Sequence, residues 1–288
     1  MLAPITPPRS SGISGRAFAL FVILVVALST AFVVAPRTLV TSGSGGGGFA
    51  NESDLVNALR VAFVGYWTSG DRSFSPSMER LVDYWFRYHV AKAVIAAVLL
   101  ALLVALGVRL WKTFLRASAL GAATQTALAS AGALVTMLAL FALAVVVANV
   151  QGAIAPFASL LSMLPTTAPK GEYANTLAQV RQGLAAYPSA GSRTPPALDV
   201  MISDYSLYHV AMVVAAAIVA MVFIGMSVML WKQFARAESS ERRTRRTWAT
   251  FGAVAVALSL AVIVVAIANV TNAADPAPGL LAYFNGGW

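Results

Sequence analysis

The chain has two histidines, His89 and His209, and each follows an aspartate and tyrosines at nearly the same spacing. Imidazoles ligate haem iron, copper or zinc, and they act as general acids or bases near neutral pH. If the hydrophobic helices pair as hairpins, an asparagine joins each group. The resulting candidate pseudo-twofold site comprises His89, His209, Asp83, Asp204, Tyr84, Tyr205, Tyr88, Tyr208, Asn149 and Asn269.

A metal centre at this site would need further ligands. Structural zinc takes four ligands, so the histidines would require help from Asp83 or Asp204. These aspartates lie six and five residues before their histidines, which does not place either one on its own histidine's helical face. Contact would have to come from the other copy or from a distorted helix. We therefore expect no cofactor, and keep haem or metal at His89 and His209 as an alternative to an interfacial girdle or a lipid or partner contact.

Catalytic signatures are absent from the sequence. There is no His-Glu-x-x-His or Gly-x-Ser-x-Gly motif, and no expected span contains an acidic residue. The absence of cysteine excludes thiol catalysis, disulfides and cysteine-based zinc sites. The glycine-rich run 42–48 does not end in the Lys-Ser/Thr of a phosphate-binding loop, so it is typical of a flexible linker. We expect a protein that is not an enzyme.

The composition indicates an integral membrane protein. Hydrophobic residues make up 59% of the 288 residues and charged residues 11%, with a mean hydropathy of +0.76, whereas soluble domains are about 25% charged. Crossing about 30 Å of hydrocarbon takes about 20 helical residues. Five stretches meet this requirement and predict an all-α fold with five transmembrane helices: 17–35, 90–108, 127–147, 210–229 and 250–267.

The charges predict an orientation. With the N-terminus inside, the inner segments hold 11 basic and two acidic residues, and the outer segments hold nine of each. Basic residues favour cytoplasmic loops, so the net charge of +9 reports topology rather than nucleic-acid binding. We therefore expect a multi-pass plasma-membrane protein with residues 1–16 in the cytoplasm, an uncleaved signal anchor over 17–35 and an extracytoplasmic C-terminus. The ratio of 16 arginines to four lysines suggests a bacterial source.

The chain carries nearly the same segment twice. The run Tyr88-His89-Val90-Ala91 recurs 120 residues later as Tyr208-His209-Val210-Ala211, and Asn149 recurs as Asn269. Upstream matches such as Arg60 with Arg181 need an offset of 121. These matches predict a linker over 36–50 followed by tandem repeats at 51–165 and 171–288, each an extracytoplasmic helix plus a transmembrane hairpin.

Each repeat is expected to contain the same helices. It begins with an amphipathic helix, which in the two copies has the apolar stripes Val56, Leu59, Phe63, Tyr66 and Tyr173, Leu177, Val180, Leu184, Tyr187. A hydroxyl N-cap followed by proline, at Ser75-Pro76 and Thr194-Pro195, then begins a continuous helix of about 40 residues. Continuity of both long helices predicts a π-bulge between Tyr84 and Tyr88 to absorb the extra residue of the first copy.

Two parallel hairpins predict a pseudo-twofold four-helix bundle to which the first span is an addition. The cytoplasmic ends of these hairpins carry the residues expected of interfacial anchors. These are Trp111, Lys112, Arg116, Trp231, Lys232 and Arg236.

These observations favour a non-enzymatic membrane protein that binds a partner or lipid through its extracytoplasmic face, as an accessory, assembly or sensor-like subunit. Its expected partners are the lipid bilayer and a membrane or extracytoplasmic protein. A transporter or channel with parallel repeats is the alternative, but such carriers usually place ionisable residues or broken helices near mid-bilayer. The spans offer only Gly107, Gly225, Ser227, Thr136 and Ser259.

Overall fold

The computed structural model describes residues 15–43, 49, 51–116, 121–168, 170–190 and 194–287, and within these residues the chain is helical with no strand. The all-α prediction is therefore confirmed. Residues 1–14 of the predicted cytoplasmic N-terminus and residues 44–48 and 50 of the predicted linker lie outside the described part of the chain.

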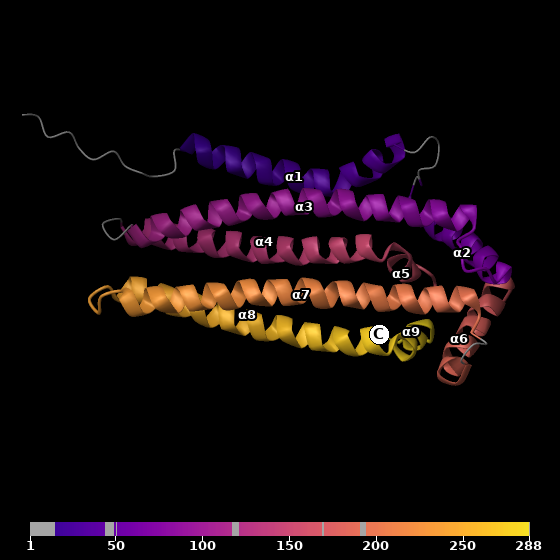
Figure 1. Cartoon of the computed structure of the whole chain (residues 1–288). Coiled ribbons are helices and arrows are strands. Elements are labelled where there is room, and N and C mark those ends of the chain that lie inside the picture. The colour runs from indigo at the N-terminus through magenta and orange to yellow at the C-terminus, as the bar shows by residue number, and fades with distance from the viewer. Residues whose placement is uncertain are drawn as a thin grey trace, which may run out of the picture. The chain divides into compact units, whose positions relative to one another are not determined.

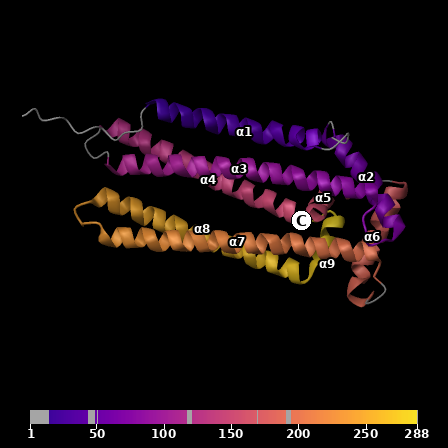
Figure 2. The ribbon, with the colours of Figure 1, turned by 45° about the horizontal axis from the view of Figure 1, so that its top comes forward.

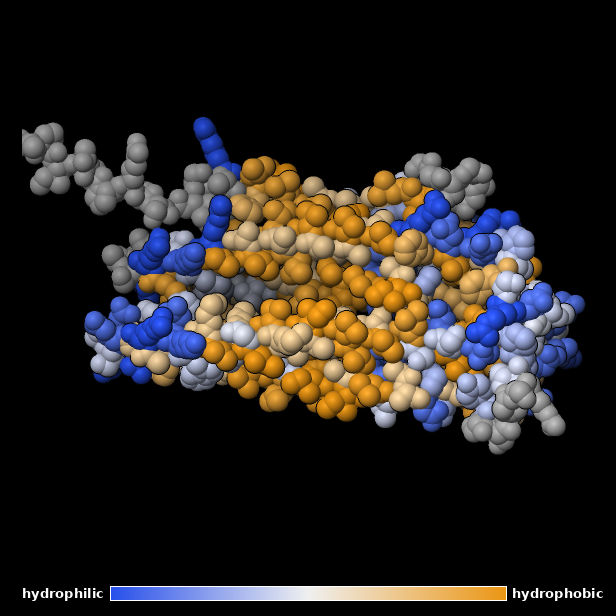
Figure 3. Space-filling view, in the orientation of Figure 1, coloured by the Kyte–Doolittle hydropathy of each residue, from blue (hydrophilic) through white to orange (hydrophobic). Residues whose placement is uncertain are grey.

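Five of the described helices are long and apolar enough to cross a membrane, which confirms the prediction of a multi-pass membrane protein. They are α1 (Gly15–Gly43), α3 (Pro76–Arg116), α4 (Ala122–Ile154), α7 (Pro196–Arg236) and α8 (Arg242–Ala274). Figure 3 shows hydrophobic residues covering the long helices between hydrophilic ends. Helix α1 continues through Pro36 to Gly43, so the first part of the predicted linker is helical.

The long helices occur in pairs of equal length. Helices α3 and α7 have 41 residues each, and α4 and α8 have 33 each. All four are labelled in Figure 1. The predicted continuous helices of about 40 residues are thus present. At the start of α3, Ser75 Oγ accepts a hydrogen bond from the Met78 N–H at 3.4 Å, as expected of an N-cap.

The predicted start of α7 is wrong by one residue. The helix begins at Pro196, and its N-cap is Pro195 rather than Thr194. Pro195 has an extended backbone with ψ of 133° because the residue before a proline is kept out of the helical region. Pro195 is therefore the N-cap because Pro196 follows it.

The predicted π-bulge is also wrong, because α3 is α-helical from Pro76 to Arg116. The extra residue lies in a connection instead. Helix α2 (Glu52–Ser69) and α3 are separated by six residues, whereas α6 (Glu172–Ala190) and α7 are separated by five. A connection absorbs a residue at little cost, while a bulge interrupts the helical hydrogen bonds.

This register changes which residues correspond. Because the offset is 120 throughout α3 and α7, Tyr205 corresponds to Trp85, and Asp204 corresponds to Tyr84. Asp83 and Asp204 are therefore not equivalent, although the sequence matches predict that they are.

The chain forms two compact units. The smaller unit contains α1 up to residue 33 and residues 95–144 of α3, α4 and their connection. Its core is formed by Leu103, Leu106 and Leu110 of α3 with Val135 and Ala142 of α4. This apolar hairpin is the part of the smaller unit on which α1 packs.

The larger unit contains residues 34–94 and 145–288, and α7 and α8 pack against each other within it. It also contains an assembly that we call the cap: α2, α5 (Pro156–Leu161), α6, α9 (Pro276–Phe284) and the adjoining ends of α3 and α7. Helices α2 and α6 lie side by side (Figures 1 and 2). The cap core contains Leu59, Phe63, Tyr66, Met78, Phe157, Leu177, Val180, Leu184, Leu198, Met201 and Phe284.

The predicted apolar stripes of α2 and α6 supply much of this core. Tyr66 is fully buried, and α2 ends at Gly70, whose φ of 68° suits a glycine C-cap. Leu55 rather than the predicted Val56 is the first buried residue of the α2 stripe. Short helices α5 and α9 were not expected from the sequence, although each has a proline at its first position.

Candidate functional site

His89 lies where α3 enters the cap, and its ring packs on Gly152 of α4. A Cβ atom added at Gly152 would lie 2.7 Å from ring atom Cε1, so only glycine admits the ring. The His89 Nδ1 lies 3.1 Å from Asn149 Oδ1. Asn149 Nδ2 donates to the Val145 carbonyl at 2.7 Å. Because the amide nitrogen is used in that bond, Oδ1 faces the ring and the network assigns a proton to His89 Nδ1.

The other ring nitrogen faces a serine of α5. Ser159 Oγ lies 3.4 Å from His89 Nε2, and Trp85 Nε1 donates to the same Oγ at 3.0 Å. The serine hydroxyl hydrogen is therefore directed at Nε2. One chain of donors runs from Trp85 through Ser159, His89 and Asn149 to the backbone of Val145.

Asp204 of α7 contacts the beginning of α5, next to the hydrogen-bond network of His89. Its Oδ2 accepts the Ala158 N–H of α5 at 2.7 Å, whereas the N-cap residue Ala155 provides no side-chain cap. A carboxylate at a helix N-terminus is favourable for charge and hydrogen bonding. Gln151 adds a second link to α7, because its Nε2 donates to the Tyr208 carbonyl at 3.1 Å. Asp204 and Tyr208 of the second predicted repeat thus bond to residues that lie next to His89 in the first.

Ser159, His89 and Asn149 have the order of an acyl-transfer triad. Two observations indicate instead that these residues hold α3, α4 and α5 together. Ser159 is 9% exposed, and the main-chain N–H groups nearest its side chain are occupied. The Ala158 N–H donates to Asp204, and the Ser159 N–H donates to the Ala155 carbonyl at 3.1 Å. Neither N–H can stabilise an oxyanion in this arrangement.

His209 repeats only part of this arrangement. Its Nδ1 lies 2.7 Å from Asn269 Oδ1, and Asn269 Nδ2 donates to the Val265 carbonyl at 2.8 Å. Its Nε2 is buried and has no hydrogen-bond partner among the described residues. Gly279 stands 120 residues after Ser159, so the hydroxyl that serves His89 is missing here.

The remaining predicted site residues separate into two environments. Asp83 lies outside the site on an exposed surface, where it pairs with Arg87 at 2.9 Å. Tyr84 is buried edge-on against Phe49, with ring centroids 5.0 Å apart, and Tyr88 stacks on Trp85 at 5.3 Å. In the second predicted repeat, the rings of Tyr205 and Tyr208 lie edge-on to His209 at 4.5 and 5.7 Å.

The candidate metal ligands do not form a cluster. Each histidine directs Nδ1 to the asparagine of its own hairpin. Among the described residues, no group of three or more His, Cys, Asp or Glu is placed to hold a metal ion. Metal binding at His89 would have to displace Asn149 or Ser159.

The predicted anchors form the opposite ends of the hairpins. Lys112, Arg116, Lys232 and Arg236 are exposed. The two tryptophans have an additional contact that the anchor prediction does not include, because each packs on a glycine of the partner helix. A Cβ atom would lie 2.9 Å from the Trp111 ring at Gly132 and 3.0 Å from the Trp231 ring at Gly252.

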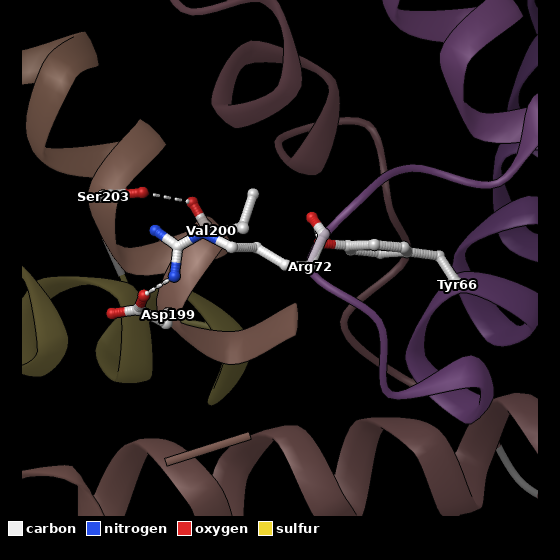
Figure 4. A network of polar contacts seen from close by, with 5 residues as sticks. All are labelled: Tyr66, Arg72, Asp199, Val200 and Ser203. Carbon is white, nitrogen blue, oxygen red and sulfur yellow. Dashed lines mark hydrogen bonds and ion pairs between the residues drawn. The ribbon is translucent and has the colours of Figure 1, made fainter. Parts of the chain in front are cut away.

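An ion pair that sequence reasoning missed joins the α2–α3 connection to α7. Arg72 Nη1 lies 2.6 Å from Asp199 Oδ2 (Figure 4). The two side chains are 68% and 40% exposed, so the pair contributes about 0–1 kcal/mol. Tyr66 donates to the Arg72 carbonyl at 3.4 Å, and burial raises the pKa of Tyr66 to about 12 although Arg72 lowers it, so the phenol stays neutral.

A second missed contact fixes α9 in the cap. Arg181 donates to the Phe284 carbonyl through Nε at 2.8 Å and Nη2 at 2.6 Å, and Nη2 also donates to the Thr166 carbonyl at 2.5 Å. The single hydroxyl hydrogen of Tyr283 is shared between the carbonyls of Leu161 and Leu164, which lie 2.9 and 3.0 Å from Oη. The recurrence of Arg60 as Arg181 was the available sequence signal, but the sequence does not show its acceptors.

Comparisons of the chain with models of known protein families, with curated proteins and with solved structures find no match.

Proposed function

We propose that this chain is a non-enzymatic, multi-pass protein of a bacterial plasma membrane that binds a protein partner through its cap, as an accessory or assembly subunit. In this proposal α1 is a signal anchor, the rest of the chain is a tandem duplication, and the cap faces the extracytoplasmic side. Paired helix lengths and the repeated His–Asn contacts support the duplication.

The observation that carries the proposal is that the most deeply buried large side chains lie in the cap rather than in the spans. Among the described residues, the twelve largest fully buried side chains all belong to the cap. In the most apolar stretch of each candidate span, only 6–28% of the residues are buried. A cap with its own core keeps a fixed surface. Preorganisation of this kind lowers the ordering cost of binding a partner.

The polar residues of the spans support binding over transport. Thr136 donates to the Gly132 carbonyl at 2.8 Å and accepts from Trp111 at 3.1 Å. Ser259 donates to the Ala255 carbonyl at 2.7 Å, and Ser227 donates to the Gly252 carbonyl at 3.4 Å. These hydroxyls are therefore bonded within their hairpins rather than offered to a passing solute.

Quantitative mass spectrometry of the tagged full chain, isolated from its native membrane in mild detergent, tests the proposal. We expect one protein partner in near-stoichiometric amount, absent when an unrelated multi-pass protein of the same membrane carries the tag. Recovery of the chain alone, or with lipid only, would overturn the proposed function.

A further inference from the structure

A crevice of about 440 Å³ opens in the cap between α2 and α6. It is lined by Asn57, Arg60, Val61, Val64, Glu172 and Tyr173. Val61 is 76% exposed although it lies on a folded cap rather than on a spanning segment. The crevice therefore combines an exposed apolar side chain with hydrogen-bonding groups.

Among the described residues, Arg60 has no oxygen partner in this crevice. Its guanidinium carbon lies 4.8 Å from the centroid of the Tyr173 ring. The Tyr173 hydroxyl donates to the Pro165 carbonyl at 2.6 Å, which fixes the ring in place. The ring face accepts positive charge but supplies no oxygen, and Arg60 Nε is buried with no acceptor among the described residues.

Arg181 shows what an arginine in this position binds. It lies six residues before Tyr187, as Arg60 lies six residues before Tyr66, and it donates to the Phe284 carbonyl at the end of α9. The residue 120 positions before Phe284 is Leu164, whose carbonyl already accepts from Tyr283. The carbonyl that corresponds to the acceptor of Arg181 is therefore bonded to Tyr283 and makes no hydrogen bond with Arg60.

Building on the proposed function, we infer that this crevice receives main-chain carbonyl oxygens of the partner polypeptide, from the last turn of a helix or from a chain end. The last carbonyls of a helix have no partner within it and accept hydrogen bonds from arginine. Glu172 disfavours a free inorganic anion but can accept a main-chain N–H. Val61 and Val64 provide an apolar surface for a side chain of the same segment.

The test uses the full chain in its native membrane with p-benzoylphenylalanine in place of Val61. We expect photo-crosslinking to the copurifying partner, at the end of a helix or at a chain terminus of that partner. With Arg60→Ala the crosslink and the recovered partner should each fall by about tenfold or more, because the charged donor of the crevice is lost. Arg80→Ala, which removes an exposed arginine of α3, is the matched control and should change neither.

The outcomes separate this inference from the proposed function. Undiminished partner recovery with Arg60→Ala, or a crosslink to lipid alone, overturns the crevice as the contact while the proposed function stands. Failure of the unmodified chain to recover any partner overturns both. The elution profile and thermal unfolding of Arg60→Ala should stay close to those of the unmodified chain, because within the described residues Arg60 makes no hydrogen bond and the substitution loses only its stacking contact with Tyr173. If this variant unfolds, Arg60→Gln replaces it in the same assay.

Discussion

The two aspartates before the histidines lie in different surroundings. Asp204 accepts the Ala158 N–H and holds the beginning of α5 against α7. Asp83 is exposed and pairs with Arg87 one helical turn away. The sequence groups them because both precede a tyrosine. Whether a carboxylate meets another helix depends on rotation about the helix axis, and a one-residue change of register alters this rotation by about 100°.

We predict that Asp204→Ala lowers the free energy of unfolding by about 1–3 kcal/mol, because the Ala158 N–H loses a charged acceptor. Asp83→Ala removes an exposed ion pair between residues four apart on one helix. It should change the free energy of unfolding by less than about 0.5 kcal/mol. Unfolding of both variants in detergent measures the difference. Amide hydrogen exchange over residues 156–161 should quicken only in Asp204→Ala. Equal effects of the two changes would contradict the observed register.

At the level of elements, the long helices were predictable and the short ones were not. Apolar runs without breakers specify α3 and α7, whereas α5 and α9 have only six and nine residues and carry no periodic stripe. The His–Asn pairs could also be expected once the hairpins close. Ser159 could not, because its contact with His89 depends on the turn made between α4 and α5.

Packing of a ring on glycine is a hairpin contact that can be tested within α7 and α8. We predict that Gly252→Leu destabilises the protein by about 1–3 kcal/mol, because its side chain would overlap the Trp231 ring. Gly225→Leu is the matched control, since a Cβ there meets nothing within 4 Å, and it should stay within about 0.5 kcal/mol. Resistance to thermal unfolding in detergent compares them. A larger loss for Gly225→Leu would show that the hairpin packs on another face.

For the whole molecule, five apolar helices and a separately cored cap support one central claim. We propose that the cap is delivered preformed to the extracytoplasmic side, where its α2–α6 surface meets a partner. The positive charges at the opposite ends of the spans predict this orientation from sequence, because basic loops favour the cytoplasm. Folding of the cap follows from its core, but the side of the membrane on which it lies depends on charge and insertion.

The orientation is measured most directly by labelling single cysteines, since the chain has none of its own. Ser53→Cys places an exposed thiol on α2 of the cap, and Ser240→Cys places one on the α7–α8 connection. A membrane-impermeant maleimide should label Ser53→Cys in intact cells and Ser240→Cys only after the membrane is permeabilised. Labelling of Ser240→Cys in intact cells, with Ser53→Cys protected, would contradict an outward-facing cap.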